Sequence, residues 1–337
     1  MAKSTLTVYC SVILLSCLAA GASACQTAAV ATVDRVGGAS QMDEMPALEQ
    51  VSLAENIRVQ VVATTSIVGD VVQNVGGEHI ELKVLLPPGT DPHTFQPAPQ
   101  DVAAVADAHV VFVSGAGLER FLQRLLDSSG AKAVVPVSFG VELQHARSQV
   151  GVEAQVELDE YDPHTWFDPL NVLVWTRNIE QALSAIDPRN APAYADNAQR
   201  YRTRLEQLDA WIQGQVSQVP EQRRKLVTDH TALTYFASRY GLQQIGAVLP
   251  GYSTLAEPSA SDLSQLEDAI RSLKVPAIFV ESTVNPTLAQ RVASDTGTRL
   301  VFIYTGSLSE ADGPADSYLK LMEFDVSTMV RALTGGG

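Results

Sequence analysis

Short β-rich runs alternate with helical stretches in two separate series along this chain of 337 residues. The runs of the first series cover residues 57–64, 79–86, 109–115 and 133–138, and those of the second cover 225–228, 242–249, 276–281 and 299–304. Strands that alternate with helices form parallel sheets with helices on both faces. The sequence therefore predicts an α/β protein with two lobes, each a parallel sheet flanked by helices.

A long helical region, residues 169–219, separates the two series. After a break at "DPRN" it continues for about 26 residues with apolar positions at helical spacing, which corresponds to a helix about 39 Å long. We expect a rigid connecting helix within residues 187–220, between an N-terminal lobe at 56–186 and a C-terminal lobe at 221–337. The alternative is an ordinary surface helix of one domain.

The first 24 residues have the pattern of an export signal. Lys3 provides a positive start, residues 8–20 form an apolar stretch, and Ala22-Ser23-Ala24 is a small-residue cleavage site. Thirteen apolar residues are too few for a permanent membrane span, which needs about 20.

Cleavage after Ala24 would leave Cys25 first, and "ASAC" resembles a bacterial lipoprotein box, although Ala22 stands where Leu, Val or Ile is usual. We expect a lipid anchor at Cys25 that holds the protein outside the cytoplasm on the cell membrane. Residues 25–55 are small, polar and aperiodic, which predicts a flexible tether.

Charge and cysteine content exclude several functions for the body. A net charge of −15 argues against nucleic acid as a partner. All three cysteines lie within the first 25 residues, so the body has neither a thiolate zinc site nor a thiol nucleophile nor a disulfide. G-x-S-x-G, Walker A, G-x-G-x-x-G and H-E-x-x-H patterns are also missing from the sequence.

Three of the six histidines have settings that indicate a shared site. His93 and His164 each lie in a "DPHT" tetrapeptide, and His230 lies in "TDHT". His93 and His230 follow predicted strands, where open α/β sheets bind ligands, and prolines restrict the backbone before the first two. Three neutral imidazoles suit zinc, and the neighbouring aspartates could orient them. His79, His109 and His145 lack such surroundings.

Five longer segments, in this order, resemble the metal-binding receptors of bacterial ABC importers for zinc and manganese, the cluster A-I substrate-binding lipoproteins. They are "PPGTDPHTFQPAPQD", "DPHTWFDPLN", "VTDHTALTYFASRYGL", "FVESTVNPTLAQRVASDTG" and "YTGSLSEADGPADSYLKLM". The resemblance covers residue 57 to about residue 333. It implies one metal ion in the cleft between two lobes, held by His93, His164 and His230. A histidine at position 230 is typical of zinc receptors, and glutamate is common there in manganese receptors.

Two features depart from the family pattern. Gly306 stands where the family often supplies a fourth ligand, an aspartate, so Glu310, Asp312 or water would have to complete the shell. Many zinc receptors also carry a His-rich loop between the first two ligands, whereas residues 143–162 contain one histidine and five acids, Glu153, Glu157, Asp159, Glu160 and Asp162. This loop is either a weak metal collector or simply a solvated segment.

We therefore expect an extracytoplasmic receptor, not an enzyme, that binds Zn²⁺ and delivers it to an ABC permease with its ATPase. It is expected to act as a monomer, without nucleic acid. A manganese or iron receptor on the same fold is the first alternative. A His₃ zinc hydrolase with water in the fourth position is the second.

Overall fold

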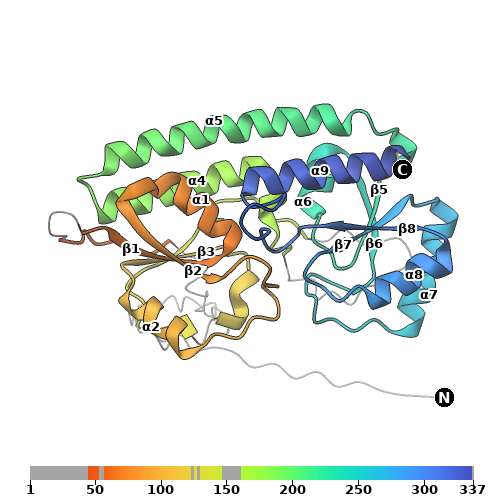
Figure 1. Ribbon diagram of the computed structural model, residues 1–337, viewed down its shortest axis with the longest axis horizontal. Coiled ribbons are helices and arrows are strands. Elements are labelled where there is room, and N and C mark those ends of the chain that lie inside the picture. The colour runs from red at the N-terminus through yellow and green to blue at the C-terminus, as the bar shows by residue number, and fades with distance from the viewer. Residues whose placement is uncertain (1–44, 53–56, 123–124, 127–129, 146–160, 336–337) are drawn as a thin grey trace, which may run out of the picture. The chain divides into compact units, whose positions relative to one another are not determined.

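Two four-stranded parallel sheets form the framework of the protein (Figure 1). In the computed structural model, β1 (Val59–Thr65), β2 (Ile80–Leu86), β3 (Val110–Val113) and β4 (Val134–Pro136) form the first sheet in the order β2-β1-β3-β4. The second sheet contains β5 (Lys225–Thr228), β6 (Gln243–Ala247), β7 (Ala277–Glu281) and β8 (Arg299–Ile303) in the equivalent order β6-β5-β7-β8. The predicted fold class is confirmed.

The structure describes residues 45–52, 57–122, 125–126, 130–145 and 161–335, all within the second of two units into which the chain divides. The predicted export signal, Cys25 and the loop acids Glu153, Glu157, Asp159 and Glu160 lie outside these residues. Among the described helices, none is both long and apolar enough to cross a membrane.

The strands read as continuous apolar runs because both faces of each sheet are covered. In β1, Val61 and Ala63 belong to one core cluster and Val62 belongs to another. In β7 the same alternation puts Phe279 in the first cluster and Ile278 in a third. This period of two follows from the pleat, which points successive side chains to opposite faces.

Helices cover both faces of these sheets. They are α1 (Ser66–Gly76), α2 (Pro99–Asp107), α4 (Pro169–Ile186), α5 (Ala191–Val216), α6 (Thr234–Tyr240), α7 (Ala260–Leu273), α8 (Thr287–Thr296) and α9 (Tyr318–Thr334), with 3₁₀ turns η1 (Gly77–His79), η2 (Leu118–Leu122), η3 (Thr165–Phe167) and η4 (Glu221–Arg223).

Residues 118–122 form the 3₁₀ turn η2, and residues 125 and 126 are helical. Glu119 there has φ −89° and ψ 23°, outside the helical region. Its buried carboxylate accepts hydrogen bonds from the Thr64 hydroxyl and from the backbone N–H groups of Ser114 and Gly115. The side chain thus bonds to the ends of β1 and β3, which favours a tight turn over a regular helix.

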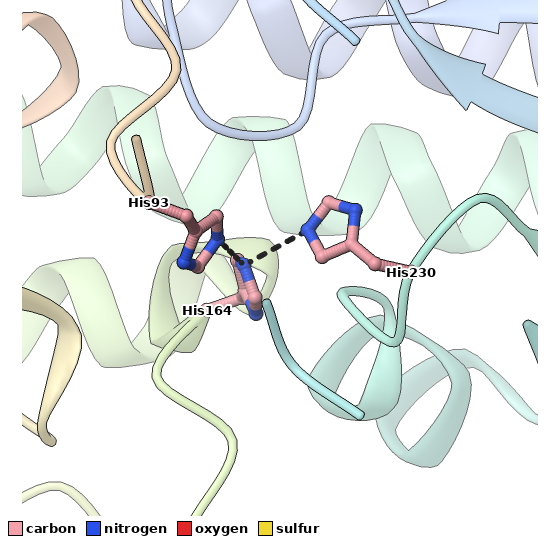
Figure 2. A group of neighbouring side chains, drawn as sticks. All are labelled: His93, His164 and His230. Carbon is pink, nitrogen blue, oxygen red and sulfur yellow. Dashed lines mark hydrogen bonds between the residues drawn. The ribbon is translucent and has the colours of Figure 1, made fainter. Parts of the chain in front are cut away.

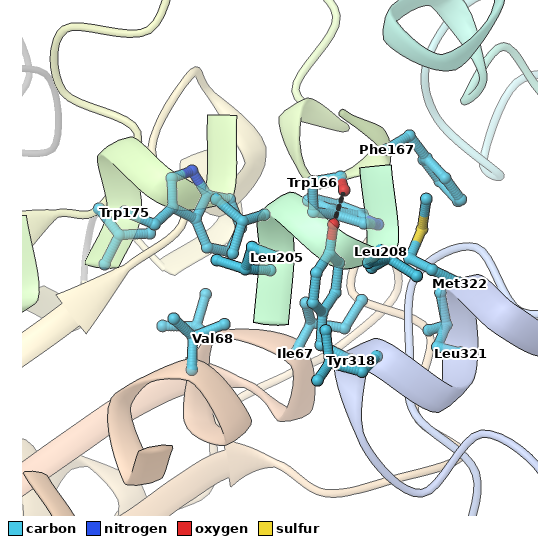
Figure 3. Packing of buried hydrophobic residues seen from close by; sticks show 14 of the residues in the cluster. Ile67, Val68, Trp166, Phe167, Trp175, Leu205, Leu208, Tyr318, Leu321 and Met322 are labelled. Atoms are coloured by element: carbon cyan, nitrogen blue, oxygen red, sulfur yellow. Dashed lines mark hydrogen bonds between the residues drawn. The ribbon is translucent and has the colours of Figure 1, made fainter. Parts of the chain in front are cut away.

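Helix α5 joins the two lobes, as predicted for the long helical region. It packs against α1 and α4 beside the first sheet, and against α6 and α9 beside the second (Figure 1). Its buried face includes Tyr201, Leu205 and Leu208 at helical spacing. Figure 3 shows Leu205 and Leu208 packed among side chains of α1, α4 and α9, so a single apolar cluster spans the junction between the lobes.

An ion-pair network fixes α6 to the same helix. Arg239 of α6 donates Nε and Nη2 to the two carboxylate oxygens of Asp209 in α5, at 2.6 and 2.7 Å. The same Nε lies 3.2 Å from Asp168 Oδ1, at the start of α4. Paired, two-point bonds of this kind are geometrically specific. The segments that carry the second and third predicted ligands are therefore both held to α5.

Part of the predicted tether packs on the body. Met45, Leu48 and Val51 contact the main core cluster, and the Val51 N–H donates to the carbonyl of Ile186 at 2.9 Å. Residues 45–52 are therefore packed against the body, in contrast to the flexible tether that we predicted for this segment. The apolar side chains favour this contact because it removes them from water.

Leu205→Ala should lower the free energy of unfolding by about 2–5 kcal/mol, because it leaves a cavity in the cluster that joins the lobes. Leu255, which is 65% exposed, provides a matched control with the same chemical change. Leu255→Ala should stay within about 0.5 kcal/mol of the unchanged protein. Urea unfolding followed by circular dichroism measures both, and equal effects would contradict a continuous core through α5.

Candidate metal centre

The three histidines predicted as ligands lie together, although they come from three separate segments (Figure 2). His93 lies between β2 and α2, His164 directly precedes η3, and His230 follows β5. The Nε2 atom of His164 is 3.3 Å from that of His93 and 3.3 Å from that of His230. His164 and His230 are fully buried, and His93 is half-buried.

The spacing of these nitrogens fits a four-coordinate metal. Zinc–nitrogen bonds of about 2.0–2.1 Å in a tetrahedron separate neighbouring ligand atoms by about 3.3–3.4 Å. The two measured Nε2 separations are 3.3 Å, and the ring centroids are 5.1 to 5.4 Å apart. Two of the three nitrogen pairs therefore already have the separation expected around one zinc ion, and the ligand atoms of all three imidazoles lie within 4.8 Å of one another.

Two buried aspartates fix the orientation of two of the rings. Asp162 Oδ1 accepts both the backbone N–H of His164 at 2.9 Å and its Nδ1 at 2.7 Å. Asp229 Oδ1 likewise binds the backbone N–H of His230 at 2.8 Å and its Nδ1 at 3.1 Å. A carboxylate on Nδ1 places the proton there and leaves Nε2 to bind a metal.

Asp91 has a different role, although it occupies the same place in its "DPHT" motif as Asp162. Its Oδ1 accepts the backbone N–H of His93 at 2.8 Å, and its Oδ2 accepts the hydroxyl of Thr254 at 2.7 Å. Thr254 belongs to the C-terminal lobe, between β6 and α7. Asp91 therefore holds the His93 loop against the opposite lobe instead of orienting the imidazole.

Residues 305–308 also connect the two lobes beside the histidines. The Gly89 N–H donates to Ser307 Oγ at 2.9 Å, and the Leu308 N–H donates to Ser66 Oγ at 3.0 Å. Trp166 donates its indole N–H to the Thr305 carbonyl at 2.9 Å, and its ring lies edge-on to His164. These bonds hold the segment that contains Gly306 close to the first two histidines.

Burial and charge set different protonation states for the three imidazoles. Burial lowers the pKa of His93 well below its usual value, and burial also lowers the pKa of His164 although Asp162 opposes it. For His230, burial acts to lower the pKa, but the Asp229 carboxylate outweighs it and raises the pKa to about 9. At neutral pH His230 is therefore a cationic imidazolium, which carries a second proton on Nε2 in addition to the one on Nδ1.

The acids expected as replacements for the fourth ligand do not join the cluster. Glu310 and Asp312 are exposed, and neither belongs to the groups of potential ligands within the described part of the chain. The sequence analysis missed Glu281, which forms such a group with Asp229 and His230. Glu281 ends β7, and β7 lies next to β5, which leads into His230. An acid at the end of a predicted strand is the sequence signal that could have identified it.

The other three histidines lie away from the site. His79 packs edge-on against Tyr194, His109 Nδ1 accepts the backbone N–H of Gln60, and His145 lies against the Tyr161 ring. Each has a local contact, and none belongs to a potential ligand group among the described residues.

Comparisons with known proteins found a family model and relatives that cover most of the chain. Residues 61–332 match the family model described as ZnuA, the periplasmic component A of the zinc-uptake complex. The manganese-binding lipoprotein MntA of Halalkalibacterium halodurans is 33% identical over 277 residues, covering 82% of this chain and 89% of the relative.

Two solved structures extend the similarity to the fold. The Mn-bound periplasmic metal-binding protein of Candidatus Liberibacter asiaticus matches with a TM-score of 0.72 at 27% identity, covering 82% of this chain and 100% of that one. The periplasmic zinc-binding protein TroA of Treponema pallidum matches with a TM-score of 0.73 at 27% identity, covering 82% and 99%.

The apparent affinity for zinc should rise about tenfold per pH unit between pH 7 and about pH 9, because the second proton of His230, on Nε2, must leave before this atom can bind the ion. Above the raised pKa the proton is already gone and the affinity should level off. Competition against a chelator at several pH values measures this slope. An affinity that stays flat from pH 7 to 9 would contradict it.

Asp229→Asn is the matched control for that experiment. The amide keeps the shape of the side chain but removes the charge that raises the pKa of His230. The rise in affinity should then move to lower pH, toward the ordinary imidazole range near 6.5.

Proposed function

This chain belongs to the family of the periplasmic A components of zinc-uptake complexes, and on that premise we propose that it captures Zn²⁺ for an ABC importer. Family membership makes it a substrate-binding protein of an ABC importer for divalent metal ions, and the metal ion is the transported substrate. The observation that supports the proposal most directly is the convergence of three imidazoles from both lobes, with His164 Nε2 3.3 Å from the Nε2 atoms of His93 and His230.

The donor set favours zinc over manganese. Imidazole suits zinc, whereas carboxylate, carbonyl and water suit manganese. Three imidazoles converge here, and the third, His230, stands where manganese receptors of this family commonly have glutamate. The buried carboxylates Asp162 and Asp229 bind the far side of two rings and so increase the basicity of their Nε2 atoms.

A manganese receptor on the same fold is the second candidate. MntA, the relative reported above, binds manganese, and the Candidatus Liberibacter asiaticus structure contains that ion. The fold is thus compatible with either cargo, and the ligand at position 230 is the feature on which we base the choice of zinc.

Location and partners follow from family membership. We propose that the protein acts outside the cytoplasm, anchored through Cys25, and that the loaded form docks on a permease that is driven by an ATPase. We assign it no catalytic role. Hydrolysis of esters or phosphoesters that stops on chelation of zinc would count against this assignment.

His230→Ala should weaken zinc binding at least about tenfold in competition with a chelator, because it removes one of three ligands from a buried site. His79→Ala is the control, since it deletes a histidine outside the cluster. An unchanged affinity of the His230 variant would overturn the site assignment, provided that the His79 variant behaves like the parent protein.

Metal-free protein offered equimolar Zn²⁺ and Mn²⁺ should retain zinc, as measured by elemental analysis after gel filtration. His230→Glu should shift the retained metal toward manganese, because it replaces an imidazole with an oxygen ligand. Retention of manganese by the parent protein would establish the second candidate instead.

A further inference from the structure

Glu281 is a buried carboxylate beside His230 and Asp229. It takes no part in orienting the three imidazoles. It ends β7, directly beside β5, whose end leads into Asp229 and His230. Only 1% of its surface is exposed. One ligand atom each from Glu281, His230 and Asp229 lie within 4.8 Å of one another. Its backbone N–H donates to Asp229 Oδ2 at 3.0 Å, so Glu281 is coupled to the residue that orients His230.

The two oxygens of this carboxylate have different surroundings. Oε1 accepts the backbone N–H of Gly306 at 2.8 Å. Within the described part of the chain, Oε2 is buried and has no hydrogen-bond partner. Burial raises the pKa of Glu281, and the charge of His230 and the nearby Thr305 hydroxyl oppose this shift. The Thr305 hydroxyl does not meet Oε2 with hydrogen-bond geometry. A buried, unpaired carboxylate oxygen is costly unless something else binds it.

The lack of a side chain at Gly306 leaves room for the Glu281 carboxylate. A β-carbon built on Gly306 would lie 2.7 Å from Pro92 Cδ and 3.0 Å from Glu281 Oε1. An aspartate side chain therefore has no room here unless its neighbours move. The space beside the histidines that the family often gives to an aspartate at this position is occupied by the Glu281 carboxylate and by Pro92.

We propose that Glu281 supplies the fourth ligand to the metal ion, through Oε2, in place of the aspartate that Gly306 replaces. The inference rests on the proposed function, because it concerns the same ion. Oε1 keeps its hydrogen bond from the Gly306 N–H, which fixes the orientation of the carboxylate. Oε2 then occupies the fourth coordination position, which the three histidines do not fill.

Charge supports this assignment. Asp162, Asp229 and Glu281 are each at most 2% exposed and lie around the histidines. A divalent cation among the imidazoles would stabilise the ionised form of these buried carboxyl groups. A carboxylate ligand also suits zinc, with a zinc–oxygen distance of about 2.0–2.2 Å.

Ligation requires a local movement of the side chain. Glu281 groups with His230 and Asp229 but not with all three imidazoles in the metal-free arrangement. A tetrahedral site would place Oε2 about 3.3 Å from each Nε2. The carboxylate must therefore turn about its own torsions toward the ion when the ion enters.

A crystal structure of the unmodified protein loaded with zinc chloride, with anomalous scattering at the zinc edge, tests the proposal without any substitution. We expect four ligands, with Glu281 Oε2 about 2.0–2.2 Å from the zinc. Water as the fourth ligand, with Glu281 still turned away, would overturn this inference and leave the zinc receptor intact. Failure of the parent protein to bind zinc would overturn both.

A second experiment uses the variant Glu281→Gln. The amide keeps the size of the side chain and an oxygen that can accept the Gly306 N–H. Zinc affinity should fall at least about tenfold in chelator competition. Glu310→Gln, an exposed acid a few residues beyond Gly306, is the matched control and should bind like the parent. Thermal unfolding of the metal-free variants checks their folding. A folded Glu281→Gln variant with the parent's affinity would contradict the proposal.

Discussion

Three imidazoles from distant parts of the chain converge in one largely buried place, where His164 Nε2 lies 3.3 Å from the Nε2 atoms of His93 and His230. The surrounding structure holds these imidazoles in place. Asp162 and Asp229 fix two rings directly, while Arg239 ties α6 to α5 and to the start of α4. Because α5 packs against both lobes, displacement of one lobe disturbs the geometry of the ligands from the other.

Electrostatics gives this arrangement its selectivity for a cation. The site concentrates carboxylates where solvent cannot screen them, and the metal-free protein compensates with a proton on His230. Exchange of that proton for a divalent ion adds positive charge to a region that is rich in negative charge. Under the proposed function, both the surroundings and the ligands would favour binding, and binding would release a proton from His230.

Much of this could be predicted from the sequence, since the relevant signals are local. Apolar runs in β1 and β7 predict buried parallel strands, and prolines before His93 and His164 indicate stiff loops. The different roles of Asp91 and Asp162 could not be predicted. Their tetrapeptides are identical, and the difference depends on Thr254, which lies 163 residues from Asp91. Glu281 was missed because its importance depends on what surrounds it in space, and the turn at Glu119 depends on bonds to two strand ends.

Gly306 has a consequence for how such a protein can evolve. A side chain at this position would meet Pro92, which belongs to the motif that places His93, and also Glu281. A return to aspartate by a single substitution would therefore disturb a ligand loop before it could contribute a ligand. The three positions form an epistatic set in which the order of substitutions matters, because neighbouring residues do not act additively. With the proposed ligands, an aspartate at position 306 becomes accessible only after Pro92 or Glu281 changes.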